Sequence, residues 1–162
     1  MNLTNLLIKA RGRIANRENW TAGALARDRD ELALPTAFDF RAVQWCAQGA
    51  CVWAVHEFAT DSQRNLALAQ MLDLLDQAAD ELGAKVFAGE LRNGLGHEVK
   101  PRPLMVMNDV CGHRATLNAF DLAIERQQII DGLKWLSDPD GRNCYHDHTN
   151  SGDQYRKLAE GV

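Results

Sequence analysis

Four side chains of this sequence carry the functional groups that a nucleophilic hydrolase or transferase requires. Cys46 offers a thiol, His113 an imidazole, and Asn108 and Asp28 polar groups. A cysteine nucleophile needs a base that generates the thiolate and a third group that orients the base. The four residues are therefore a candidate catalytic set, provided that the fold brings them together in one concave pocket.

A second imidazole, that of His56, fits this set less well, because it follows Cys46 on the same predicted helix at a distance of about three turns. The alternative for Cys46 is a small buried hydrophobe beside Trp45. No cation precedes or follows it closely, so the thiol would stay protonated. On that alternative, Cys46→Ser places a hydroxyl where no partner is evident, at a cost of about 1–3 kcal/mol.

The pair Asn108-Asp109 also has two interpretations. It precedes Gly112 and a long predicted helix. Asn and Asp side chains in such places accept hydrogen bonds from backbone N–H groups. The pair is therefore either part of a site or a means of satisfying the backbone of a loop.

Near the C-terminus, Cys144, His146 and His148 are close enough in sequence to bind one metal ion. His-x-His spacing allows a strand or loop to present both imidazoles to one ion, although a closed zinc site needs four ligands. The preceding run 138–143 resembles part of a calcium loop, but its Gly comes too early and the final Glu is missing. The three residues are a candidate metal site in a polar tail.

The composition excludes several classes of protein. The 162 residues, of which 46% are hydrophobic and 25% charged, fit one globular domain. A net charge of -4 argues against a nucleic-acid binder. We find no membrane span and no signal peptide, and therefore expect a cytoplasmic protein. The sequence has no Walker, dinucleotide, GxSxG or HExxH pattern, so we expect no cofactor.

The candidate residues must be positioned by helices, because apolar residues recur at helical spacing through most of the chain. The expected helices cover residues 4–16, 40–58, 63–82 and 116–136, with Asp39 capping the second and Asp61 or Ser62 the third. Residues 20–35 fit a two-stranded hairpin or an ordered loop, and residues 104–107 are too short to distinguish strand from helix. We thus expect a mainly α, compact domain of about four helices over residues 1–137, with a possible small β-hairpin, followed by a polar tail over 138–162.

Helical spacing also predicts which faces are buried. In the first helix these residues are Leu3, Leu6, Leu7, Ala10 and Ile14. In the third they are Leu66, Ala69, Leu72, Leu75, Ala79 and Leu82, and in the last Leu117, Phe120, Ile124, Ile130, Leu133 and Leu136.

Three short motifs concentrate the rare residue types. They are Trp20-Thr21-x-Gly23-Ala24-x-Ala26-Arg27-Asp28, Trp45-Cys46-Ala47-x-Gly49-Ala50 and Asn108-Asp109. On these motifs, the chain from Leu3 to Ile130 resembles a family of small uncharacterised proteins from bacteria, especially actinobacteria, and their phages, which is known only as a domain of unknown function. Met107 stands where that family typically carries Trp. The resemblance implies a mainly helical cytosolic domain, and it carries over no activity.

Three functions remain open. The first is binding of another macromolecule, most simply a host or defence protein bound by a phage-encoded factor, with Trp20, Trp45 and Asp109 as binding residues. The second is the hydrolase or transferase described above, and the third is a self-assembling structural protein, which would form a homo-oligomer. Whichever holds, we expect Trp20 to pack near Trp45, because two large aromatic residues must bury their area.

Overall fold

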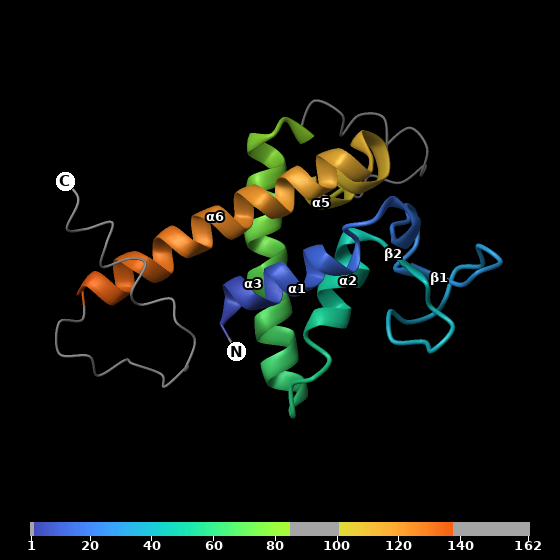
Figure 1. Cartoon of the computed structure of the whole chain (residues 1–162), viewed down its shortest axis with the longest axis horizontal. Coiled ribbons are helices and arrows are strands. Elements are labelled where there is room, and N and C mark those ends of the chain that lie inside the picture. Colours follow the sequence, from blue (N-terminus) through green and yellow to red (C-terminus); the bar gives the residue numbers. More distant parts are fainter. Residues whose placement is uncertain (1, 85–100, 138–162) are drawn as a thin grey trace. The chain divides into compact units, whose positions relative to one another are not determined.

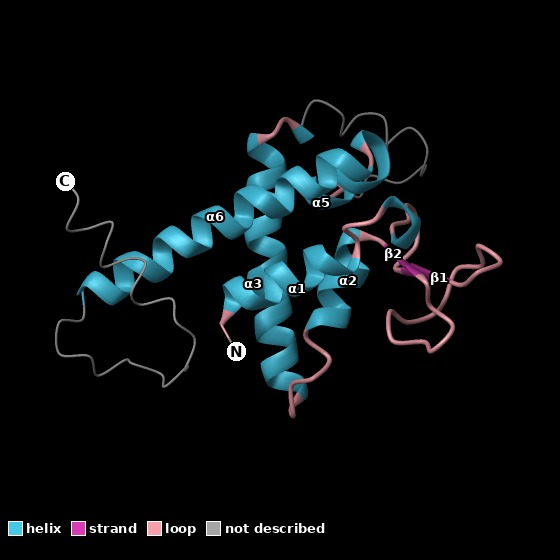
Figure 2. Cartoon of the chain, viewed as in Figure 1, coloured by secondary structure: helices cyan, strands magenta, loops and turns pink. Residues whose placement is uncertain are grey.

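The computed structural model describes residues 2–84 and 101–137, with side chains up to residue 134. The chain divides into two units, Met1–Glu125 and Arg126–Val162. The described residues form five α-helices and one two-stranded antiparallel sheet (Figures 1 and 2). The prediction of a mainly helical fold is therefore confirmed.

The elements follow one another along the chain with few strand residues. The α-helices are α1 (Leu3–Arg13), α2 (Ala47–Ala54), α3 (Asp61–Glu81), α5 (Pro103–Val106) and α6 (His113–Ser137). The strands are β1 (Ala26–Arg27) and β2 (Gln44–Trp45), with Ala26 opposite Trp45. A short 3-10 helix, η1 (Arg17–Asn19), follows α1, and a π-helical turn, η2 (Met107–Cys111), follows α5.

Helix α1 has the apolar face that its spacing predicts. Its buried members are Leu6, Leu7, Ala10 and Ile14, with Leu3 partly buried at the edge. The side chain of Asn2 caps the helix by accepting a hydrogen bond from the backbone N of Asn5 at 2.9 Å. The helix ends earlier than predicted, at Arg13, because the N–H of Ile14 turns back to the carbonyls of the last turn.

The prediction of a single helix over residues 40–58 is wrong. Gln44 and Trp45 form β2, and α2 begins only at Ala47. The cause is tertiary, since β2 pairs with β1 and the N–H of Cys46 donates to the carbonyl O of Leu25 at 3.2 Å. Asp39 caps no helix, and its Oδ1 instead accepts the N–H of a local turn, that of Arg41, at 3.0 Å.

Helix α3 exists as predicted, but its buried face differs. The hydroxyl of Thr60 is the N-cap, accepting from the N–H of Gln63 at 3.3 Å, in place of the predicted Asp61 or Ser62. The buried residues are Ala67, Met71, Leu72, Leu75, Ala78 and Ala79. The predicted Leu66, Ala69 and Leu82 are exposed. Leu and Ala occupy several sides of this helix, so spacing alone allows two stripes, and packing against α1, α2 and α5 selects one.

Residues 104–107 are helical, which decides between the two structures that the sequence left open. Gly112, at φ +86°, separates η2 from α6 in a region of backbone space that favours glycine. Helix α6 begins at His113, earlier than predicted, and buries Phe120 fully. The predicted inward face does not continue to Ile130 and Leu133, which are exposed, and the side chain of Leu136 lies outside the described residues.

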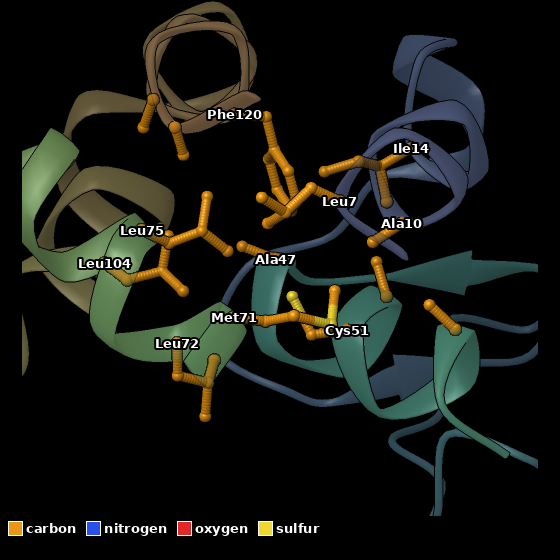
Figure 3. Close-up of a cluster of buried hydrophobic side chains, with 14 of the residues drawn as sticks. Leu7, Ala10, Ile14, Ala47, Cys51, Met71, Leu72, Leu75, Leu104 and Phe120 are labelled. Atoms are coloured by element: carbon orange, nitrogen blue, oxygen red, sulfur yellow. The ribbon is translucent and has the colours of Figure 1, made fainter. Parts of the chain in front are cut away.

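The core of the first unit lies where α1, α2, α3, α5 and the first turns of α6 meet (Figure 3). Leu7, Met71, Leu75 and Phe120 converge there, and all four are fully buried. The small residues of α2 allow its backbone to approach the others closely. None of the helices in the described part of the chain is long and apolar enough to cross a membrane.

Candidate functional site

The three motifs meet at the side chain of Asn108. Its Oδ1 accepts hydrogen bonds from the indole Nε1 of Trp20 at 2.9 Å and from the backbone N of Ala47 at 3.0 Å. Its Nδ2 donates to the carbonyl O of Thr21 at 3.2 Å and to Oδ1 of Asp109 at 2.6 Å. A carboxamide offers two donors and two acceptor positions, so every position is used. We call these five residues the junction.

The π-helical turn η2 places Asn108 inward. The N–H of Gly112 donates to the carbonyl O of Met107 at 3.0 Å, the wide spacing of a π turn. Met107 and Asn108 are both buried. The same turn carries Asp109, so both side chains of the third motif enter the junction from one element.

Trp20 lies beside Trp45, as predicted. The N–H of Thr21 donates to the carbonyl O of Trp45 at 3.1 Å, and the two tryptophans form a parallel bridge. Both rings are buried, with 6% and 5% exposure. The indole N–H of Trp45 donates to the carbonyl O of Ala37 at 2.9 Å, while the Trp20 ring lies 5.5 Å from that of His113. These are satisfied interior aromatic residues, and the proposal that they bind a partner remains a prediction.

Asp109 completes the connection to the first motif. Its Oδ1 accepts the N–H of Gly23 at 3.1 Å, and Gly23 itself has φ +70°. The prediction that Asn108 and Asp109 satisfy backbone donors is therefore confirmed, with Ala47 and Gly23 as the donors. The two residues lie in a helical turn and not in the loop that the sequence predicts.

The charged end of the first motif shapes a turn. The Nε of Arg27 donates to the hydroxyl of Thr21 at 2.9 Å. Oδ1 of Asp28 accepts the N–H groups of Asp30 and Leu32, each at 3.0 Å. The carboxylate that was a candidate catalytic group thus holds its own loop together.

Gly49 marks the closest backbone approach near the junction. A Cβ built at this position would lie 1.9 Å from the carbonyl O of Leu25. No side chain fits at that distance, so α2 can lie against the segment before β1 only because residue 49 is glycine.

Cys46 is the N-cap of α2. Its Sγ accepts the N–H of Gly49 at 3.3 Å. Burial raises the pKa of the Cys46 thiol, the hydrogen bond from Gly49 opposes this, and the charge of Asp109 raises the pKa further. The predicted position in the helix interior is wrong, because the chain before Ala47 belongs to the sheet. A hydroxyl at position 46 would find a donor, contrary to the expectation from sequence.

Residues 1–126 match the model of a protein family, the Family of unknown function (DUF6197). The chain belongs to this family. No curated protein and no solved structure matches it. The DUF6197 region contains the whole junction and reaches the end of the first unit at Glu125.

In this DUF6197 chain, the four candidate catalytic residues are used separately. Nε2 of His113 donates to the carbonyl O of Ile14 at 2.7 Å, and Asp28 and Cys46 bind backbone N–H groups. Within residues 2–84 and 101–134, no hydrogen bond joins any two of the four. Cys46 and Asn108 are brought together through the backbone of Ala47, which follows Cys46 and donates to Asn108. A catalytic role for the set remains a prediction.

The predicted metal ligands Cys144, His146 and His148 lie outside the described residues. Within the described part of the chain, no group of three or more His, Cys, Asp or Glu side chains could hold a metal ion.

Among the described side chains, the two exposed phenylalanine residues, Phe38 and Phe40, lie elsewhere, in the β1–β2 connection, which comprises residues 28–43. Phe40 is 95% exposed, and Leu32 and Phe38 are 63% and 48% exposed. Buried Leu34 and Ala37 anchor the same segment to the core. We did not predict this surface from the sequence, because residue 40 was expected to begin a helix and residues 20–35 to form a hairpin or an ordered loop.

Proposed function

We propose that this chain is a binding protein, and that its partner is another protein bound through the β1–β2 connection. The observation that carries the proposal is the exposure of Phe40, Phe38 and Leu32 on one anchored segment. Full burial of such a side chain stabilises a protein by about 1.5–3 kcal/mol, of which the fold gains almost nothing from Phe40 and only part from Leu32 and Phe38. Aromatic residues of this kind are enriched in the cores of protein interfaces.

The connection is ordered well enough to present these side chains before binding. Oδ1 and Oδ2 of Asp39 accept from the guanidinium of Arg41 at 3.0 and 2.9 Å, and this pair lowers the pKa of Asp39 to about 2. Glu31 has φ +62°, and its carbonyl O accepts from Arg27 at 2.6 Å. A preformed loop loses less conformational entropy when it binds, so affinity is gained without new contacts.

The size, the net charge of -4 and the lack of a local catalytic motif support the same proposal. In its specific form, a phage-encoded factor acts in the cytoplasm on a bacterial host or defence protein. The hydrolase and the self-assembling protein are weaker candidates, since no observation among the described residues favours either.

Affinity capture with matched variants tests the proposal. The full chain, a Leu32→Ser/Phe40→Ser variant and a Leu66→Ser control are immobilised and exposed to a bacterial lysate. Leu66 is 62% exposed on α3 and controls for the loss of an exposed leucine. A stoichiometric partner held by the wild-type chain and the control, and lost by the double variant, supports the proposal. Equal retention by all three, or no partner, refutes it.

A further inference from the structure

The guanidinium of Arg13 is held between two indole rings at the end of α1. Its Cζ lies 4.0 Å from the ring centroid of Trp45 and 3.8 Å from that of Trp53. Its Nε is buried and has no hydrogen-bond partner among the described residues. Burial lowers the pKa of Arg13, but an arginine remains charged at any ordinary pH. This cation is fixed in place by the faces of its neighbours.

Arg13 is the middle member of a row. Lys9 precedes it by one turn of α1, with Nζ 5.0 Å from the Trp53 centroid, and Arg17 follows it, with Cζ 4.4 Å from the Trp20 centroid. We call Lys9, Arg13 and Arg17 the cation row. Each member lies over an indole ring, an arrangement in which the ring quadrupole attracts the charge.

Four arginines of the first unit have a carboxylate partner, whereas Arg13, Arg17, Arg27, Arg29 and Arg114 have none among the described residues. Aspartates bind the side chains of Arg11, Arg41, Arg64 and Arg102. Within residues 2–84 and 101–134, neither Arg13 nor Arg17 has a carboxylate partner. Lys9 has one, Glu57, at 2.8 Å, on a side chain that is mostly exposed. Arg13 differs from Arg27, Arg29 and Arg114 in its position between two indole rings.

The stacked geometry suits a carboxylate from outside. Aromatic contacts cover the face of a guanidinium, whereas its N–H groups lie in the plane and point past the rings. A carboxylate accepts two of these N–H groups at once, and a bond between charged groups beside apolar rings is stronger than one in water. Because the guanidinium is already held in place, little side-chain entropy is lost when it binds.

The cation row is continuous with the exposed aromatic residues. The ring of Trp53 lies 5.8 Å from that of His56, which lies 5.8 Å from that of Phe38 in the β1–β2 connection. Nδ1 of His56 donates to the carbonyl O of Trp53 at 2.7 Å, so this imidazole is oriented by the helix. One surface therefore presents apolar aromatic edges next to two arginines, Arg13 and Arg17, that have no carboxylate partner among the described residues.

We infer that this surface recognises an acidic peptide segment of the partner protein, whose carboxylates bind Arg13 and Arg17 while its apolar side chains contact Phe38. This inference rests on the proposed function and specifies the partner. Single-stranded nucleic acid also combines anionic groups with stacking rings. We choose the peptide because the chain as a whole is acidic, which disfavours a long phosphate backbone.

The test is a selection from a random displayed peptide library on the immobilised full chain. Selected peptides are expected to be enriched in Asp and Glu. A representative peptide should bind Arg13→Gln at least about tenfold more weakly, which corresponds to about 1.4 kcal/mol. Arg114→Gln is the matched control, since Arg114 is an exposed cation of α6 outside the row. Binding should also weaken as salt is added.

Arg13→Lys provides a second variant that keeps the charge and removes the planar fork. Loss of binding in this variant as well, with wild-type near-UV circular dichroism, supports recognition by the guanidinium. Selected peptides without acidic enrichment, or equal binding by Arg13→Gln and the wild-type chain, overturn the inference. So does binding of oligothymidylate that is tighter than that of any selected peptide and depends on Arg13.

The same selection separates the two proposals. The alternative result is a selection of apolar peptides, with weaker binding to Phe40→Ser and unchanged binding to Arg13→Gln. This result would support the proposed function and overturn the inference that the bound segment is acidic. A selection that enriches no peptide on any of these proteins contradicts both.

Discussion

The junction and the cation row both use tryptophan, but to different effect. At the junction, the Trp20 ring is sealed and its N–H donates to Asn108 at 2.9 Å. At the cation row, the partly buried Trp53 lies under two cations, Lys9 and Arg13, of which Arg13 has no carboxylate among the described residues. The comparison shows that the rare residues of the sequence motifs, such as Trp20 and Asn108, stabilise the interior of the fold. The cations that form an accessible surface belong to no motif.

Trp45 belongs to both regions. Its backbone carbonyl accepts a hydrogen bond from the N–H of Thr21, a junction residue. Its indole N–H donates to the carbonyl O of Ala37 in the β1–β2 connection, and its ring lies under Arg13. The surface is therefore built on the junction, and the two regions are separable only by substitutions that leave Trp45 in place. The four predictions below use such substitutions, in order of decreasing effect on stability.

Asn108→Ala should have the largest effect. It leaves the Trp20 indole N–H and the Ala47 N–H buried without an acceptor, and each such donor costs about 1–3 kcal/mol. We expect the free energy of unfolding to fall by roughly 3–5 kcal/mol in a urea titration. Asn118→Ala, at an exposed position of α6, is the control and should change it by less than about 0.5 kcal/mol. A loss for Asn108→Ala as small as that of the control would show that the junction does not stabilise the fold.

Gly49→Ala should come next. The added methyl would lie 1.9 Å from the Leu25 carbonyl O, so α2 or the segment before β1 must move. Overpacking of this kind costs about 3 kcal/mol. Gly12→Ala in α1 is the matched control, because nothing lies within 4 Å of its added Cβ. It should stabilise the helix by about 0.5–1 kcal/mol, and thermal unfolding of both variants would measure the contrast. Changes in melting temperature of the same sign for both variants would contradict the close contact between residue 49 and the Leu25 carbonyl.

Arg13→Gln should cost far less stability than either junction variant. It removes two cation–π contacts, worth about 0.5–2 kcal/mol, and also the buried Nε that has no partner. We expect a net loss of about 1 kcal/mol or less in the same urea titration. A loss comparable to that of Asn108→Ala would make Arg13 a structural residue and would erase the difference between the two regions.

Cys46→Ser should have the smallest effect. Serine is a preferred N-cap, and its hydroxyl can accept the Gly49 N–H, so the free energy of unfolding should change by less than about 1 kcal/mol. Cys51→Ser, in the fully buried interior of α2, should cost about 1–3 kcal/mol. Because burial raises the pKa of Cys46, iodoacetamide should label it slowly near neutral pH. Rapid labelling of the native protein would instead restore the catalytic set.

The sequence predicted what depends on local spacing. The α1 face was predicted correctly, because all of that helix's large apolar residues except the exposed Ile8 lie on one stripe. For α3 the prediction was correct for Leu72, Leu75 and Ala79 only, since leucine and alanine occupy several of its sides and packing selects among them. Residues 44–45 look helical by themselves, and pairing with residues 26–27 makes them a strand. Such pairing outweighs weak local propensity.

The arrangement of the candidate site was harder to predict than the helices and strands, because it depends on contacts between residues far apart in the sequence. Asn108 meets Thr21 and Ala47 across separations of 87 and 61 residues, and no spacing rule connects them. The sequence did single out the three motifs that meet at Asn108. It also predicted that Trp20 packs near Trp45, from the area that both rings must bury. The exposure of Phe40 was hidden by the helix assigned to it, and the stacking of Arg13 between two indoles requires α1 and α2 to be placed first.

The separations at Asn108 also set the order in which the molecule can assemble. Closing a loop of that length costs entropy before any contact compensates for it, so structures with many distant contacts fold slowly. During synthesis, the N-terminal helix leaves the ribosome long before residue 108 is added. Until then the N–H donors of Trp20 and Ala47 lack their acceptor on Asn108, and the junction that supports the cation row is incomplete. A ribosome-bound chain that stops short of η2 should therefore be unable to bind the proposed partner, and binding would become possible only once the domain is nearly complete.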